Sequence, residues 1–228
     1  MEQPEQHCGN TRQRLLESAC EVFARKGYRA ATIAEICERA SANIAAVNYH
    51  FRDKASLYGE AWRLAFDLSI ERHPPDGGVP PEAPAAERLR GHILAIVSRV
   101  ADPQSYEFEI IHKELANPTG LLTGVMGECI EPIRRCFEAI VRELLGEAAT
   151  DEQVWLCQMS VRSQCFDLMI HHQRRRLFGH REPPGPVPPP AIDVKILADH
   201  IADFCLAGIA DLRRRIENHE TTESESSL

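Results

Sequence analysis

The sequence predicts an all-α protein in which a small three-helix head precedes a larger helical bundle. Apolar residues recur at intervals of three and four along most of the 228 residues, which is the spacing of one helix face. No stretch of useful length alternates with period two, as a half-buried strand would. Segments rich in proline and glycine separate the helical stretches and mark loops.

Composition is that of an ordinary globular protein, with 43% apolar and 26% charged residues. No run approaches the roughly 18 to 20 apolar residues that a membrane-spanning helix needs. The first ten residues, MEQPEQHCGN, lack the basic and apolar regions of a secretory signal. We therefore expect a cytoplasmic protein with no membrane partner.

The eight cysteines include no CxxC pair, and most lie within apolar helical patterns. This favours reduced, buried thiols over zinc binding or disulfide switching, with Cys8 as the one readily reactive thiol. The sequence also lacks paired carboxylates, a nucleophile with a base at catalytic spacing, a phosphate-binding loop and a metal-ligand cluster. We expect no catalytic residues, no metal, no cofactor and no enzyme activity.

The head is predicted to begin after a disordered tail, residues 1–10. Asn10 or Thr11 caps a first helix that runs to about Lys26, and Gly27 ends it because glycine favours a left-handed C-terminal cap. The buried face of this helix is predicted to carry Leu15, Ala19, Val22 and Phe23.

The stretch from Thr32 to Lys54 is typical of a helix-turn-helix. Thr32-x-x-Glu35 has the form of a capping box, which opens a short helix, and Ala40-Ser41-Ala42 supplies small residues for a tight turn. Asn43 can cap a second helix, from Ile44 to about His50. Val47 and Phe51 share its buried face, whereas small or hydrogen-bonding residues face outward: Ala45, Asn48, Tyr49 and His50.

Basic charge is concentrated in this head although the whole chain carries a formal charge of −8. Between Thr11 and Lys54 there are eight Lys or Arg residues against five Asp or Glu residues. A basic end on an acidic body is consistent with a protein that binds nucleic acid at one end.

The body is predicted to hold the remaining helices. The first of them, which follows Arg52 or Asp53 and runs to about Arg72, has a predicted apolar stripe of Leu57, Tyr58, Ala61, Leu64, Ala65 and Leu68. A loop at 74–84 precedes helices near 85–101, 105–116, 119–146, 151–178 and 191–217. Pro132 is expected to kink or break its helix near Cys129. PPGPVPPP at 183–190 is predicted to be an extended spacer, and 218–228 a disordered tail.

The first 60 or so residues resemble the N-terminal domain of the TetR family of transcriptional regulators. The matching segments are TRQRLLESACEVFARKGY, ATIAEICERA, SANIAAVNYHF and RDKASLY, in that order. Two further segments, ELANPTGLLTGVMGECIEPIRR and LADHIADFCLAGI, more loosely resemble the C-terminal domain of a subgroup, the CerR-like regulators. The resemblance implies a helix-turn-helix DNA-binding domain at 11–58 and an effector-binding and dimerisation domain at 59–217.

Two residues depart from the family pattern. Ser41 stands where the family usually has glycine, so the turn must accommodate a Cβ atom. Asn48 stands where many members have tyrosine, which implies an altered base preference.

The resemblance assigns DNA contacts by position. It places five residues against the major groove: Asn43, Ile44, Ala45, Ala46 and Asn48. Four others match positions that usually touch the phosphate backbone: Thr32, Tyr49, His50 and Lys54. Ala46 and Asn48 are expected to read bases, since asparagine can bind adenine and an alanine methyl can meet a thymine methyl. For Tyr49 and His50 the alternative is core packing.

The resemblance also implies a homodimer, formed through the last two long helices, and a pocket for a small-molecule effector. Apolar or polarisable residues of the middle helices, with His112 and Gln164 as polar anchors, are the pocket candidates: Phe108, Ile111, His112, Met126, Phe137, Trp155, Met159, Gln164, Phe166 and Met169. The alternatives are plain core for any one of these residues and burial within the subunit for the last two helices. His171-His172 and the arginines at 174–176 are interpreted as a solvated helix end.

The function expected from these features is that of a DNA-binding transcriptional repressor, released from a palindromic operator by an effector. The alternative is an activator, or a constitutive DNA-binding protein whose body recruits a protein partner.

Overall fold

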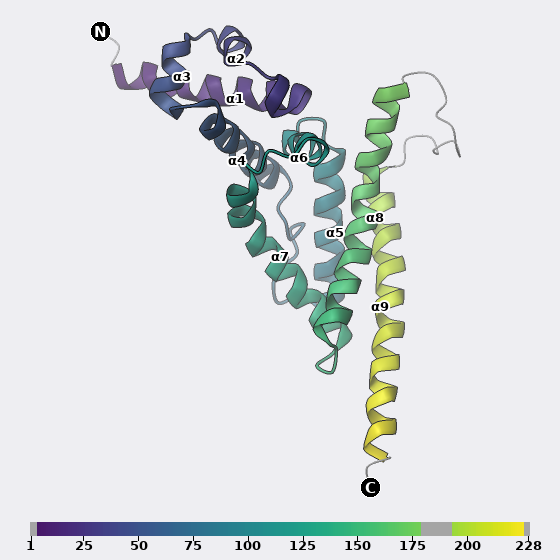
Figure 1. The fold of residues 1–228 in the computed structure, drawn as a ribbon. Helices are drawn as coiled ribbons and strands as arrows, with labels where there is room; N and C mark the ends of the chain where they lie inside the picture. Colours follow the sequence, from purple (N-terminus) through teal and green to yellow (C-terminus); the bar gives the residue numbers. More distant parts are fainter. Residues whose placement is uncertain (1–3, 179–192, 226–228) are drawn as a thin grey trace. The chain divides into compact units, whose positions relative to one another are not determined.

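In the computed structural model every described element is a helix (Figure 1). The structure describes the backbone of residues 4–178 and 193–225, and the side chains of 11–167 and 193–218. The helices are α1 (Pro4–Ala30), α2 (Ile33–Arg39), α3 (Ile44–Phe51), α4 (Lys54–Arg72), α5 (Ala85–Ala101), α6 (Tyr106–Ala116), α7 (Thr123–Leu145), α8 (Asp151–Phe178) and α9 (Val194–Glu225). The all-α prediction is confirmed, and none of these helices is both long and apolar enough to cross a bilayer.

The chain forms two compact units, and neither is continuous in sequence. The first combines residues 1–72 with 103–131, and the second combines 73–102 with 132–228. The first unit is larger than the three-helix head because α6 packs against α1 and α4. The domain boundary predicted after residue 58 falls within α4, whose buried side chains run on from Leu57 to Ser69.

Helix α1 is longer than predicted. It begins at Pro4, so neither Asn10 nor Thr11 caps it, and the predicted disordered tail is helical from Pro4 onward. Gly27 has the positive φ expected of it, 73°, but its ψ of 173° is not that of a left-handed cap, and helical geometry resumes and continues to Ala30. A Cβ atom at Gly27 would lie 3.3 Å from the Cβ atom of Lys113 on α6, so the glycine also permits close helix packing.

An aromatic cluster joins α1 to α4 in the first unit. The ring of Phe23 meets that of Tyr58 edge-on at 4.7 Å, and Tyr28 lies 5.0 Å from Tyr58. The α4 stripe was predicted slightly out of register: Leu57, Tyr58, Ala61 and Ala65 are buried, whereas Leu68 is exposed and Leu64 half-buried. Trp62 and Phe66, which the predicted stripe omitted, are buried, and their rings stack on each other at 5.2 Å.

Helix α6 is anchored by the Glu114 carboxylate near its end. It accepts hydrogen bonds from the Tyr58 hydroxyl at 3.1 Å and from the backbone N–H groups of Thr119 and Gly120. Burial acts to raise the pKa of Glu114, but the hydrogen bonds from Thr119, Gly120 and Tyr58 outweigh it and lower the pKa. Near the other end of α6, the buried Glu107 carboxyl and Ser69 hydroxyl are hydrogen-bonded at 2.9 Å.

In the second unit, the proline- and glycine-rich loop packs closely on α5. Gly91 of α5 lies so near the loop that a Cβ atom there would overlap the carbonyl oxygen of Asp76 and come within 2.7 Å of Val79. The next residue, His92, is buried and its Nδ1 atom lies 3.2 Å from the carbonyl oxygen of Pro75. Its ring stacks on Phe137 of α7 at 4.4 Å. The loop therefore packs on α5, although its own residues are exposed or half-buried.

His92 predicts a pH dependence of stability. Burial is the main cause that lowers its pKa from 6.5 to about 4. The folded protein thus holds a neutral imidazole, whose stabilising contribution is complete above pH 6.5 and is lost as pH falls from 6.5 to 4. Each pKa unit is worth about 1.4 kcal/mol, so we expect a loss of about 3 kcal/mol over this range.

Urea unfolding at pH values between 7.5 and 4, followed by circular dichroism, measures this loss. The control is His92→Phe, which keeps an aromatic ring on Phe137 but cannot titrate. The variant should show a flatter dependence than the wild type, and parallel curves would disprove the role of His92.

Three further sequence predictions change in the body. Helix α9 runs to Glu225, past the predicted helix end at 217 and into the predicted disordered tail. Helix α7 runs through Pro132 without a break, although the two compact units divide at this residue. Proline has no N–H, so one backbone hydrogen bond of the helix is missing. The carbonyl group left without this partner lies in the preceding turn, which is largely exposed, so water can bind it instead. Cys136 is exposed, so Cys8 is not the sole accessible thiol that the sequence predicted. The spacer at 183–190 and the side chains of Cys8, Met169, His171, His172 and 174–176 lie outside the described residues.

Candidate DNA-binding surface

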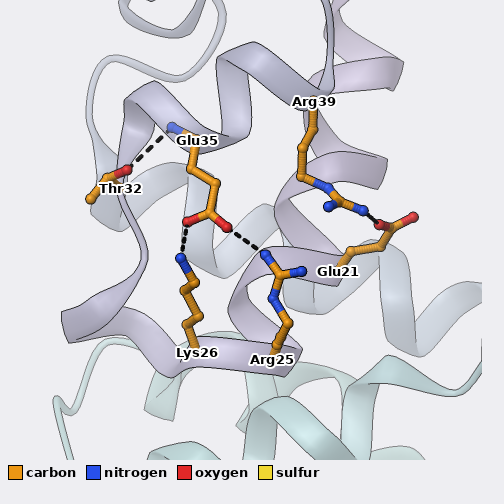
Figure 2. A network of polar contacts seen from close by, with 6 residues as sticks. All are labelled: Glu21, Arg25, Lys26, Thr32, Glu35 and Arg39. Carbon is orange, nitrogen blue, oxygen red and sulfur yellow. Dashed lines mark hydrogen bonds and ion pairs between the residues drawn. The ribbon is translucent and has the colours of Figure 1, made fainter.

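Helix α2 is fixed by half of the predicted capping box. The Thr32 hydroxyl oxygen accepts from the Glu35 N–H at 3.2 Å. The Glu35 carboxylate does not return to Thr32; it binds Lys26 at 2.6 Å and Arg25, both on α1 (Figure 2). Hydrogen bonding from Lys26 is the main cause that lowers the pKa of Glu35. The reciprocal capping prediction is wrong because two cations of α1 compete for this carboxylate.

A second ion pair shown in Figure 2 also joins α2 to α1. Arg39, in the last turn of α2, pairs with Glu21. The two ends of α2 are therefore both tied to the first helix, which fixes the platform from which the turn and α3 project.

The turn between α2 and α3 contains a strained residue. Ser41 has a φ of 50°, the left-handed region that glycine enters without steric cost. The prediction that this turn must accommodate a Cβ atom is confirmed. Two backbone hydrogen bonds hold the turn, from Ser41 N–H to Glu38 and from Ala42 N–H to Cys37.

We expect Ser41→Gly to stabilise the protein. Glycine removes the steric strain of the left-handed conformation in the folded state, but it also increases the conformational entropy of the unfolded chain. The first effect is the larger, so we expect the free energy of unfolding to rise by about 0.5 to 1 kcal/mol. Thermal unfolding measures the gain as a rise in Tm. Ser41→Ala is the matched control, since it keeps the Cβ atom and should give no rise. An equal rise in both variants would contradict this explanation.

Helix α3 presents the face that the sequence predicted. The Asn43 side chain caps it, with Oδ1 accepting from Ala46 N–H at 2.9 Å. Val47 and Phe51 are buried, as expected. The opposite face is open to solvent: Tyr49 is 77% exposed and Ile44 54% exposed. Asn43, Ala45 and Asn48 are also exposed, and Ala46 and His50 are half-buried.

The aromatic end of α3 continues this exposed face. The rings of Tyr49 and His50 meet edge-on at 4.9 Å. The exposure of Tyr49 excludes core packing as its role within this chain. Just beyond, the Lys54 ammonium lies 4.4 Å from the centre of the Tyr28 ring, and burial lowers its pKa. Thr32, at the start of α2, is exposed.

Ion pairs reduce the number of head cations available to an external anion. Four cations have carboxylate partners in the described structure: Arg12, Arg25, Lys26 and Arg39. Arg14, Arg29, Arg52 and Lys54 have none within 4.0 Å among the residues whose side chains are described, and Arg29 instead donates to the Pro118 carbonyl. Arg14 and Arg52 are thus cations of the head that the family resemblance did not assign as DNA contacts.

The predicted pocket residues are divided between the two compact units. Phe108, Ile111, His112 and Met126 belong to the first, and all are half-buried. The other six belong to the second: Phe137, Trp155, Met159, Gln164, Phe166 and Met169, the last with its side chain outside the described residues. Of these, Phe137 is buried against His92, whereas Trp155 is 54% exposed and Met159 also exposed. The Gln164 amide donates to Ser160 and Cys205 within the bundle.

A capped surface helix, a tight turn before it and cations around both define a helix-turn-helix DNA-binding domain. Residues 15–61 match the family model described as bacterial regulatory proteins of the tetR family. Residues 85–209 match the C-terminal domain of the HTH-type transcriptional dual regulator CecR, which confirms that the second half resembles the C-terminal domain of a TetR subgroup. The chain belongs to the TetR family of DNA-binding transcriptional regulators.

Known proteins of this kind are similar to most of the chain. It is 26% identical to the HTH-type transcriptional regulator SrpR of Pseudomonas putida over 60% of this chain and 62% of that protein. It is 29% identical to the uncharacterised regulator TtgW of Pseudomonas putida over 51% of this chain and 83% of that protein. A putative transcriptional regulator from Pseudomonas aeruginosa PAO1 shares the fold, with a TM-score of 0.67, 18% identity, and 94% and 96% of the two chains covered.

Proposed function

We propose that this protein is a homodimeric repressor that leaves a palindromic operator when a small-molecule effector binds to its body. The observation that carries the proposal is an apolar surface on α8 and α9. These two helices pack on each other and on α5, yet they leave large side chains exposed: Trp155, Leu156, Met159, Ile196, Phe204 and Leu212. Exposed apolar side chains of this size on neighbouring helices favour an interface with another protein surface.

A second copy is the partner that suits this surface best. One α3 helix, eight residues long, can reach only a few base pairs. Two copies related by a twofold axis place their α3 helices in successive major grooves, about 34 to 36 Å apart. A palindromic operator follows from that symmetry. A change in the separation of the two α3 helices would then prevent both from binding at once.

Effector control rests on linkage between two sites. The effector must bind more tightly to the conformation with unsuitable α3 spacing, and a shift of occupancy from 99:1 to 1:99 needs about 5.5 kcal/mol of differential affinity. The pocket candidates in the body remain proposals for this site. Thr32, Tyr49, His50 and Lys54 are proposed to hold phosphates, and Ala46 and Asn48 to read bases.

Light scattering tests the dimer, and gel shifts then test DNA binding and its release by an effector. The wild type should be a dimer, and Trp155→Asp with Phe204→Asp should give a folded monomer that loses tight binding to a duplex selected from a random pool. Small molecules that raise the Tm of the protein should then release the duplex. A wild-type monomer overturns the dimer, and operator binding unaffected by every bound molecule leaves a constitutive DNA-binding protein.

A further inference from the structure

A hollow lies beside the turn of the helix-turn-helix, on the first compact unit. It has a volume of about 360 Å³ and is formed by residues of α1, α2, the turn and α3: Thr11, Arg14, Cys37, Glu38, Ser41, Ala42, Asn43 and Ala46. Two of these residues, Asn43 and Ala46, also belong to the predicted groove-facing set. The hollow therefore adjoins the DNA-binding surface described above.

The Arg14 guanidinium in this hollow lacks an anion. Its Nε atom is buried without a hydrogen-bond partner, and its one described bond runs from a terminal nitrogen to the Thr11 hydroxyl at 3.3 Å. No carboxylate among the described side chains pairs with it. An unpartnered buried N–H on a cation costs free energy, and such groups in native proteins usually have a ligand, an ion or a water.

The other walls of the hollow suit an oxygen anion of low charge. Ser41 contributes a hydroxyl and Asn43 an amide, and the first turn of α3 has no acidic residue to repel an anion at its positive end. Glu38 also lines the hollow and contributes a carboxylate. That carboxylate disfavours a free phosphate, which carries more than one negative charge at pH 7, more strongly than a DNA phosphodiester, which carries a single charge.

We propose that Arg14 and this hollow bind one phosphate of the DNA backbone, which makes α1 a part of the DNA interface. The guanidinium presents several N–H donors in a planar fork and can bind two phosphate oxygens together. The contact would not read sequence. It would fix the depth and angle at which the neighbouring Asn43 and Ala46 approach the groove.

Salt-dependent binding of the full chain tests the proposal. Arg14→Gln should lower affinity about tenfold for operator and unrelated duplexes alike, the worth of one charge-assisted contact. The slope of log K against log salt should become shallower by about 0.9, the value for one phosphate. Arg63→Gln is the matched control, because Arg63 belongs to the same compact unit but pairs with Glu128 and does not line the hollow. Unchanged affinity and slope in Arg14→Gln would overturn the proposal.

A chemical change in the DNA identifies the phosphate. Methylphosphonate substitution, one position at a time, should weaken the wild type at one symmetric pair of positions and leave Arg14→Gln unaffected there. Equal losses in both proteins at every position would overturn the contact. Arg14→Met also removes the charge and replaces the glutamine variant in the same comparison if the glutamine variant does not fold.

Inorganic phosphate distinguishes a free ligand from the DNA backbone. We expect it to raise the Tm of the wild type and of Arg14→Gln equally. A rise confined to the wild type, together with an unchanged salt slope in Arg14→Gln, would assign the hollow to a free phosphate and overturn the DNA assignment.

Discussion

Gly91→Ala is expected to destabilise the protein by at least about 3 kcal/mol, the upper range for overpacking a core. The added methyl would overlap the carbonyl oxygen of Asp76, and a backbone atom cannot rotate away as a flexible side chain can. The loop at 74–84 would have to lift from α5, which also breaks the contact between His92 and Pro75. Urea unfolding should show a much lower midpoint, or no cooperative transition at all.

Gly124→Ala is the control for this substitution. Gly124 lies in α7, and a Cβ atom there would have no neighbour within 4 Å. Alanine is the better helix former, so this variant should gain about 0.5 to 1 kcal/mol. Equal stability of the two alanine variants would show that the loop does not pack on Gly91 as described.

Asn48 and Lys54 are expected to separate specificity from affinity. Asn48→Ala should remove one base contact and lower affinity for the selected operator by about 1 to 3 kcal/mol, with little change on unrelated DNA. Lys54→Met should weaken binding to all duplexes alike and make the salt slope shallower by about 0.9. Fluorescence anisotropy on both kinds of duplex at several salt concentrations measures the two effects.

The control for Lys54 is arginine, which retains the charge near the Tyr28 ring. Loss of the cation–π contact costs Lys54→Met some stability, so the Tm of each variant must be measured first. If both substitutions merely unfold the head, or if Asn48→Ala weakens every duplex equally, the assignment of roles is wrong.

Local patterns in the sequence were sufficient to predict the architecture of the helix-turn-helix. The caps at Thr32 and Asn43, the buried pair Val47 and Phe51, and the left-handed conformation at Ser41 all follow from rules that act within a few residues. The same short range explains the accurate bounds of α5 and α8, each predicted to the residue.

The errors concern contacts between segments distant in sequence. Glu35 pairs with Arg25 and Lys26 of another helix, which no local capping rule includes. Trp62 is buried and Leu68 exposed, contrary to the predicted stripe, because the helices packed on α4 determine which of its faces is buried. Arg14 could have been noticed as a cation on the partly buried side of α1, but its missing partner is visible only in three dimensions.

The first unit is discontinuous in sequence, and this limits where the chain can be cut to give a stable fragment or fused to give a hybrid protein. A fragment that stops at Arg72 contains the whole helix-turn-helix but lacks α6, whose Ile110 is fully buried. Such a fragment would expose the apolar faces of α1 and α4 and would lose the Glu114 anchor of Tyr58. A hybrid regulator built by joining this DNA-binding domain to another body should therefore carry residues 103–131 along with the first 72.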